Sequence, residues 1–125
     1  MESQHVLNAP SGARIAYRRW RCPAPCGQAP LVLLHGAASN LTRWSEFLEE
    51  TTLKSGRDIL RLDLRGHGDS RWRGPISLEI WSDDIAAIIA AESVPRAVLC
   101  GHCLGANIAV MFVVRHPTHT AGLVL

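Results

Sequence analysis

A cysteine between two glycines is the residue of this chain whose type and spacing point most directly to covalent chemistry. Cys103 is the centre of Gly101-His102-Cys103-Leu104-Gly105, which directly follows the apolar residues 97–100. In a glycine-x-nucleophile-x-glycine turn the nucleophile lies on a sharp strand-to-helix bend, and a Cβ at either glycine would collide with neighbouring chain. The helix that follows presents free N–H groups and the positive end of its dipole, which favours the thiolate. The spacing therefore predicts that Cys103 is a nucleophile.

A nucleophile that attacks a carbonyl also needs donors for the oxyanion that forms. The N–H of Leu104, one residue after the nucleophile, is placed to be one donor, and Ala37 in the segment after residues 31–34 is predicted to supply the other. His35 is expected to order this loop, and His102 is expected to point away from the thiol because neighbours on a tight turn diverge. The residues predicted to shape the elbow and the loop are His35, Gly36, Gly101, His102 and Gly105.

A third polar segment, Asp63-Leu64-Arg65-Gly66-His67-Gly68-Asp69-Ser70, follows another short apolar run. His67 and Asp69 have the residue types of a metal site or an acid–base pair. The glycines between them favour a role in shaping the loop instead, and neither a metal nor any other cofactor is predicted.

The elements that must position these segments alternate between short apolar runs and longer helical stretches, which is typical of a layered α/β sheet. Residues 6–7 and 14–20 alternate with period two and are predicted to pair antiparallel at an exposed edge. A helix capped by Ser77 is expected, and residues 104–114 are apolar on nearly all sides, which predicts a central buried helix. The remaining predicted elements are a helix over 42–53 and strands over 31–34, 59–63, 97–100 and 122–125. Because chemistry gathers at the carboxyl ends of parallel strands, the three segments should meet at one edge.

The three motifs, in this order and spacing, resemble the α/β-hydrolase fold family, in its esterase- or lipase-like branch, over residues 6–125. The resemblance implies a mostly parallel sheet with helices on both faces, of which residues 1–125 form the N-terminal part, about six strands, of one domain with no second domain. It implies hydrolysis of an ester, thioester or lactone, with Cys103 as nucleophile and Ala37 and Leu104 as the oxyanion hole. Most members carry serine where this chain has Cys103; cysteine there resembles dienelactone hydrolases and polyhydroxyalkanoate synthases.

The family's triad continues from the nucleophile to an acid and then a histidine. Only 22 residues follow Cys103, and His116 and His119 among them are expected to face the opposite edge of the sheet. We therefore expect this chain by itself to be inactive or weak. A further segment or a separate chain carrying the C-terminal half would supply the acid and the histidine, and the substrate would be a small acyl compound.

Two other functional classes remain open. Cys100-Gly101-His102-Cys103 is also a C-x-x-C sequence typical of thiol–disulfide oxidoreductases, although Leu99 stands where those proteins have an aromatic residue. The chain could instead be a non-catalytic pseudoenzyme or partner-binding fragment. A four-thiolate zinc site that adds Cys22 and Cys26 is disfavoured, because that pair lies in a proline-rich loop.

Composition limits the remaining partners. With 47% apolar and 19% charged residues the chain is typical of a folded globular protein, and a net charge of +2 requires no nucleic acid. No apolar run has membrane-spanning length and the N-terminus lacks the shape of a signal peptide, so a cytoplasmic location is expected. Trp44, which follows the loop after His35, is the tryptophan placed to line a pocket.

Overall fold

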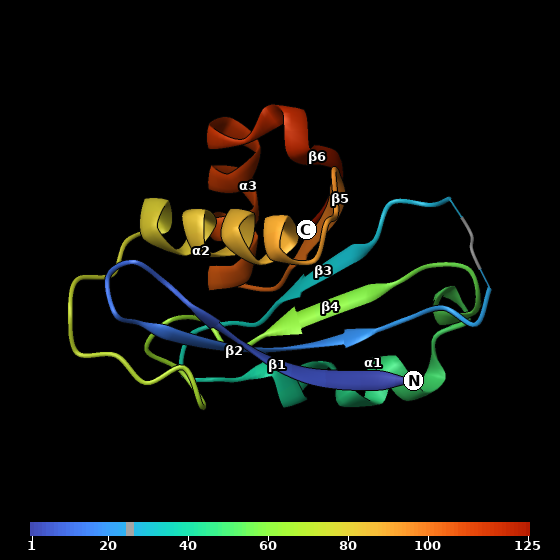
Figure 1. Ribbon diagram of the computed structural model, residues 1–125, viewed down its shortest axis with the longest axis horizontal. Coiled ribbons are helices and arrows are strands. Elements are labelled where there is room, and N and C mark those ends of the chain that lie inside the picture. Colours follow the sequence, from blue (N-terminus) through green and yellow to red (C-terminus); the bar gives the residue numbers. More distant parts are fainter. Residues whose placement is uncertain (25–26) are drawn as a thin grey trace.

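The core of the fold is a six-stranded sheet, seen in a computed structural model that describes residues 1–24 and 27–125 (Figure 1). The strand order is β1-β2-β4-β3-β5-β6, in which β1 pairs with β2 and β2 with β4 antiparallel, whereas the other pairs are parallel. The strands are β1 (Glu2–Asn8), β2 (Arg14–Trp20), β3 (Leu31–Leu34), β4 (Ile59–Leu62), β5 (Ala97–Gly101) and β6 (Thr120–Val124). The predicted mostly parallel sheet with an antiparallel edge is confirmed.

Helices cover both faces of this sheet, as predicted. Figure 1 shows α1 (Ser45–Glu50) on one side and α2 (Leu78–Ala91) with α3 (Leu104–Arg115) on the other. One apolar cluster packs the sheet against α2 and α3, with Ile85, Ile108 and Phe112 almost fully buried. A second, smaller cluster lies under α1 and includes Leu33 and Leu48. The buried strands are therefore apolar on both faces, which is why β3 contains only leucine and valine.

The predicted helix over residues 42–53 is wrong in its extent. The segment forms a 3₁₀ turn, η1 (Leu41–Trp44), the short helix α1 and a second 3₁₀ turn, η2 (Leu53–Ser55). The Asn40 side chain accepts a hydrogen bond from the N–H of Thr42 and opens the segment as a tight turn. Thr51 is extended, with φ −71° and ψ 138°, and ends α1 after six residues. β-branched threonine disfavours helix, so the chain leaves it there.

The start of α2 matches the prediction from sequence. The Ser77 side chain accepts a hydrogen bond of 3.0 Å from the N–H of Ile80 and so satisfies one of the free donors of the first turn. The face of α2 that carries Trp81, Ile85 and Ile89 is buried against the sheet and α3. Capping and apolar spacing together fix both the beginning and the rotation of this helix.

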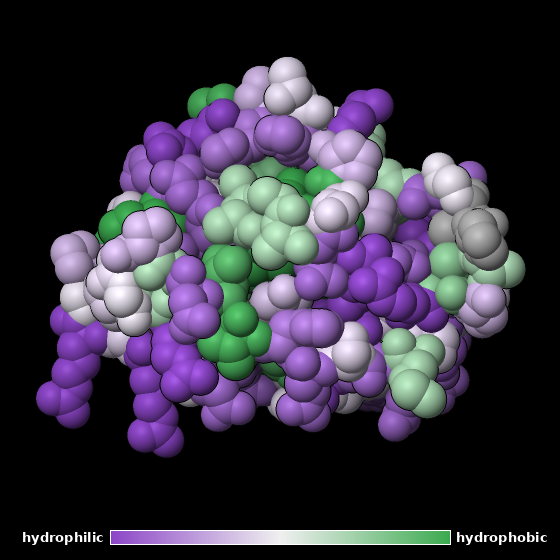
Figure 2. All heavy atoms as spheres, viewed as in Figure 1, coloured by the Kyte–Doolittle hydropathy of each residue, from purple (hydrophilic) through white to green (hydrophobic). Residues whose placement is uncertain are grey.

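The prediction that the helix over 104–114 is buried on all sides is wrong. Ile108, Ala109 and Phe112 are buried, but Val110 is 43% and Val114 71% exposed. The reason is that α3 packs on the sheet and α2 along one side only, so the remaining apolar side chains reach solvent. In the view of Figure 2, hydrophobic side chains gather near the middle of a face that is otherwise largely hydrophilic.

The far edge of the sheet is also exposed. Among the strands that the structure describes, β6 pairs with β5 alone, and Leu123 is 40% and Val124 51% exposed. An exposed edge strand of this kind carries unpaired backbone donors and acceptors. Within residues 1–24 and 27–125 no helix combines the length and the apolar character that crossing a membrane demands.

Candidate active site

The turn between β5 and α3 holds Cys103 in a conformation that few non-glycine residues adopt. Its φ is 55° and its ψ −117°. The turn is fixed on both sides, because the N–H of His102 donates to Leu34 O at 3.1 Å and the N–H of Gly105 donates to His102 O at 2.9 Å. Strained backbone of this kind persists only where its surroundings enforce it. The result is an exposed thiol at the carboxyl edge of the sheet.

Both glycines of the motif are required by close backbone contacts. A Cβ at Gly101 would collide with the backbone of Gly105, and a Cβ at Gly105 would collide with the carbonyl oxygen of Leu34. Both positions are buried. The glycines thus allow α3 to begin directly against β3 and β5, and this is what sharpens the turn.

The loop after β3 lies against the thiol. A Cβ on Gly36 would be only 3.3 Å from the Cβ of Cys103. Ala37 follows as an exposed residue, and its N–H has no hydrogen-bond partner among the residues that the structure describes. In the first turn of α3, the N–H groups of Gly105, Ala106 and Asn107 are bonded to His102 and Cys103 carbonyls. That of Leu104 has no such bond within the described chain.

His35 connects this loop with the loop after β4. Its ring is fully buried, Nδ1 donates to Gly36 O at 2.7 Å, and Nε2 accepts from the N–H of Leu64 at 3.0 Å. This pattern requires the neutral ring with the proton on Nδ1. Burial lowers the pKa of His35 below its ordinary value, which keeps the ring neutral.

Asp63 makes a second connection between the same two loops. One carboxylate oxygen accepts from the N–H of Leu41 at 2.8 Å and the other from the N–H of Asp69 at 3.0 Å. Gly68, with φ 51°, passes so close that a Cβ there would lie 2.5 Å from this carboxylate. The Asp63 side chain is therefore used in holding the backbone of the two loops.

His67 and Asp69 are not joined to each other by a hydrogen bond in the described structure. The His67 ring packs 5.2 Å from that of His35 and 6.2 Å from that of Trp81, and the carboxylate of Asp69 is exposed. The two residues belong to the packing and the turns of the loop.

The expectation that His102 points away from the thiol is wrong. Its Nε2 lies 3.6 Å from Cys103 Sγ. The ring lies beside Gly36, where a Cβ would be in ordinary van der Waals contact with it, 3.6 Å from Nδ1. In contrast, His116 bonds to Asp83 at 2.9 Å and His119 to Pro95 O at 3.0 Å, both at the opposite edge as expected.

The other cysteines are separated from this turn in different ways. Cys100 is half-buried in β5, burial raises the pKa of its thiol, and both Cys100 and Cys103 are free thiols. The N–H of Cys22 donates to Asp58, immediately before β4 and hence at the amino edge of the parallel strands, far from Cys103. Cys26, the fourth member of the disfavoured zinc set, lies outside the described residues.

Trp44 is not among the residues that line the groove described below. It packs in the cluster under α1, edge-on to Phe47 with 5.9 Å between ring centroids. Its Nε1 is buried and has no hydrogen-bond partner in the described part of the chain.

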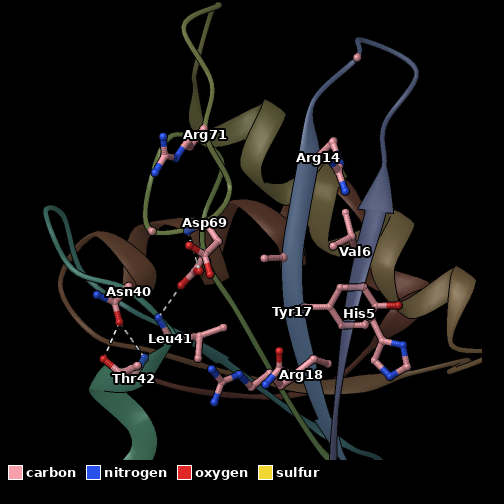
Figure 3. A pocket seen from close by; sticks show the side chains of 15 residues that line it. His5, Val6, Arg14, Tyr17, Arg18, Asn40, Leu41, Thr42, Asp69 and Arg71 are labelled. Atoms are coloured by element: carbon pink, nitrogen blue, oxygen red, sulfur yellow. Dashed lines mark hydrogen bonds between the residues drawn. The ribbon is translucent and has the colours of Figure 1, made fainter.

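A groove of about 770 Å³ was missed by the sequence analysis, and it does not contain the thiol. Figure 3 shows it between the β1–β2 hairpin and the segments that carry Asn40–Thr42 and Asp69–Arg71. Arg14, Arg18 and Arg71 line it together with Asp63 and Asp69 of the third polar segment. It borders the far end of the loop that begins at His35.

Comparison with known proteins agrees with this geometry. The family model of the alpha/beta hydrolase fold matches residues 29–125. The chain is 30% identical over 91 residues to a probable alcohol acetyltransferase of Saccharomyces cerevisiae (70% of this chain, 27% of that protein). It is 28% identical over 95 residues to the sn-1-specific diacylglycerol lipase ABHD11 of Mus musculus (76% and 31%). A crystal structure of a hydrolase from Pseudomonas aeruginosa PA01 superposes with a TM-score of 0.84 at 29% identity (98% and 45%).

The chain thus spans less than a third of the two sequence relatives and less than half of that hydrolase. Its six strands correspond to the N-terminal part of such folds, as the sequence predicted. The turn around Cys103 lies within the matched residues. On the match over residues 29–125 and the shared sheet, the chain belongs to the alpha/beta hydrolase fold family.

Proposed function

We propose that Cys103 is the nucleophile of an acyl-transfer reaction to water, with a carboxylic ester as substrate. The observation that carries the proposal is an exposed thiol, held at φ 55°, beside two backbone N–H groups without described partners. Thioesters and lactones present the same electrophilic carbonyl. The proposal is further supported by relatives whose names describe a lipase and an acetyltransferase, both of which act on acyl groups.

The proposed reaction uses these groups in the following order. Cys103 Sγ forms a bond to the carbonyl carbon, and the carbonyl oxygen becomes an oxyanion that accepts hydrogen bonds from the N–H groups of Ala37 and Leu104. The carbon–oxygen bond to the alcohol then breaks, and the alcohol leaves with the proton that the thiol gave up. Water attacks the resulting thioester, releases the carboxylic acid and returns the proton to Cys103.

The water step needs a base that can approach from the solvent side of the thioester. We propose that polypeptide beyond this chain, on the same or another molecule, supplies an acid and a histidine for it. The exposed β6 edge and the much greater length of the relatives support this proposal. Co-expression with a segment that carries such residues should raise turnover; failure of every such segment to bind or activate the chain would contradict it.

The nucleophile is tested with 4-nitrophenyl acetate and the purified chain. We expect one acetyl group per chain on Cys103, located by mass spectrometry of peptides, with little further turnover. Cys103→Ala should abolish the acetylation, and Cys100→Ala, which removes the neighbouring thiol, should retain it. Equal acetylation in Cys103→Ala would refute the assignment, and reduction of insulin that requires both cysteines would favour the oxidoreductase instead.

A further inference from the structure

We propose that the groove between the β1–β2 hairpin and residues 40–42 and 69–71 binds a phosphorylated polyol of the size of a sugar phosphate. Cys103 is not among the residues that line this groove, so the inference goes beyond the proposed function. The volume of about 770 Å³ is within the range of small-molecule sites. Figure 3 shows Arg14 of the hairpin and Arg71 of the facing loop on opposite sides of the groove, so positive charge reaches it from two elements.

The hollow itself comes from the alternation of side chains along β2. Arg14, Ala16 and Arg18 share the face of this strand that is turned away from the core, because the residues between them are buried. Ala16 is the small residue of the three, and it lies opposite Val6 of β1. Four residues of strand separate the two arginines by about 13 Å. A ligand seated over Ala16 is therefore within reach of both long side chains.

The guanidinium groups of this groove still have donors to offer. Arg14 and Arg71 are exposed, and neither makes a hydrogen bond or an ion pair with another residue of the described chain. Arg18 lies 3.8 Å from Glu2, but both oxygens of that carboxylate already accept hydrogen bonds of 2.8 Å from Arg61. Planar guanidinium groups bind phosphate oxygens in pairs, and a phosphate monoester presents three such oxygens. The arginines thus match a phosphate group.

The other polar side chains of the groove favour hydroxyl groups beside that phosphate. Asp63 is buried and both of its oxygens accept backbone N–H groups, so it is already satisfied. The carboxylate of Asp69 is exposed and accepts no hydrogen bond within the described chain, so it can accept O–H donors of a ligand. Asn40 Oδ1 accepts from Thr42, which leaves the NH₂ of Asn40 as a donor. A phosphorylated polyol uses both kinds of group, whereas inorganic phosphate uses the arginines alone.

Isothermal titration calorimetry of the purified chain near neutral pH compares glucose 6-phosphate, inorganic phosphate and glucose. We expect glucose 6-phosphate to bind with a Kd below about 1 mM, in the weak range because exposed arginine side chains must be ordered on binding. It should bind about tenfold more tightly than inorganic phosphate, since the sugar hydroxyls add bonds to Asp69 and Asn40. Glucose, which lacks the phosphate, should not bind measurably.

Substitutions then locate the binding. Arg14→Gln and Arg71→Gln each remove one charged donor and should each weaken glucose 6-phosphate binding about tenfold. Arg96→Gln is the matched control, because Arg96 is also exposed but lies before β5, at the opposite edge of the sheet, where it donates to Thr120 O. All three variants should keep the urea midpoint of the wild type and its rate of Cys103 acetylation, which shows that they fold.

The outcomes separate this inference from the proposed function. Absence of saturable glucose 6-phosphate binding would overturn it, and so would binding that Arg14→Gln and Arg71→Gln leave unchanged. Equal affinity for inorganic phosphate, or for succinate as a dicarboxylate, would contradict the assignment to a phosphorylated polyol. Cys103→Ala should bind glucose 6-phosphate as the wild type does, because the groove does not use the thiol. Failure of acetylation at Cys103 would therefore leave the groove's ligand to be decided by the titration.

Discussion

Replacing Gly105 with alanine sets two physical effects of opposite sign against each other. Gly105 is the second residue of α3, and alanine is favoured over glycine in a helix by about 1 kcal/mol. The structure, however, places the new Cβ against the carbonyl oxygen of Leu34 and 2.8 Å from that of His35. Both are backbone atoms of fully buried residues, and Leu34 lies in β3 between two strands, so neither can retreat.

Forcing one extra carbon into a packed interior costs about 1–3 kcal/mol, and contact with immobile backbone belongs at the upper end. With about 3 kcal/mol for the collision and about 1 kcal/mol returned by helix propensity, we expect a net loss of about 2 kcal/mol in the free energy of unfolding. The collision of the new Cβ lies at the contact between β3 and α3. It should therefore also displace Cys103 and slow its acetylation.

Urea unfolding followed by circular dichroism measures the free-energy change. Gly56→Ala is the matched control, because Gly56 has φ −129° and a Cβ there would meet nothing within 4 Å. It should change stability by less than about 0.5 kcal/mol. If Gly105→Ala were neutral or stabilising, the close approach of α3 to β3 would be wrong, and with it the explanation of the motif's second glycine.

Three further predictions use the same urea assay. Cys103→Gly relieves the positive φ and should raise the free energy of unfolding by about 1 kcal/mol while abolishing acetylation; a loss of stability would contradict strain at this turn. Ser77→Ala removes the cap of α2 and should cost about 1 kcal/mol, and an unchanged urea midpoint would show that the cap contributes nothing. Burial lowers the pKa of His35, so the unfolded chain binds a proton first as pH falls below 6.5. Stability is then full above that pH and falls by up to about 1.4 kcal/mol per unit below it. His35→Asn should flatten this dependence between pH 7.5 and 5.5, and an equally steep slope in the variant would assign it to another group.

The parts of the fold that follow from local sequence were predictable. Continuous apolar runs gave the parallel strands, and Ser77 with the spacing of Trp81, Ile85 and Ile89 gave the start and buried face of α2. The extent of the short helix α1 was not predictable from local sequence, because it depends on competition between nearby turns. Thr51 ends α1 early although the residues around it are compatible with helix.

The exposure of α3 could not be predicted because an apolar sequence does not state how many neighbours a helix has. Val114 is as apolar as the buried Ile108, and only the packing on α2 and the sheet distinguishes them. The order of the three motifs was enough to bring them to one edge. Side-chain direction within that edge was not encoded in spacing: the contact of His102 with Cys103 depends on the rotamers that these two neighbouring side chains adopt.

Two side chains explain how a site built from irregular loops is held in place before any substrate binds. β3 and β4 are parallel neighbours, so the loops that follow them leave the sheet side by side. His35 from the first loop accepts the N–H of Leu64 in the second, and Asp63 from the second accepts the N–H of Leu41 in the first. Each loop therefore satisfies a buried donor of the other, and neither can shift without leaving that donor unpaired, which costs about 1–3 kcal/mol. Oxyanion stabilisation depends on donors that need no reorganisation during the reaction. The reciprocal bonds of His35 and Asp63 therefore fix the start and the end of the loop that carries Ala37, the proposed oxyanion donor, and the proposal requires neither side chain to touch the substrate.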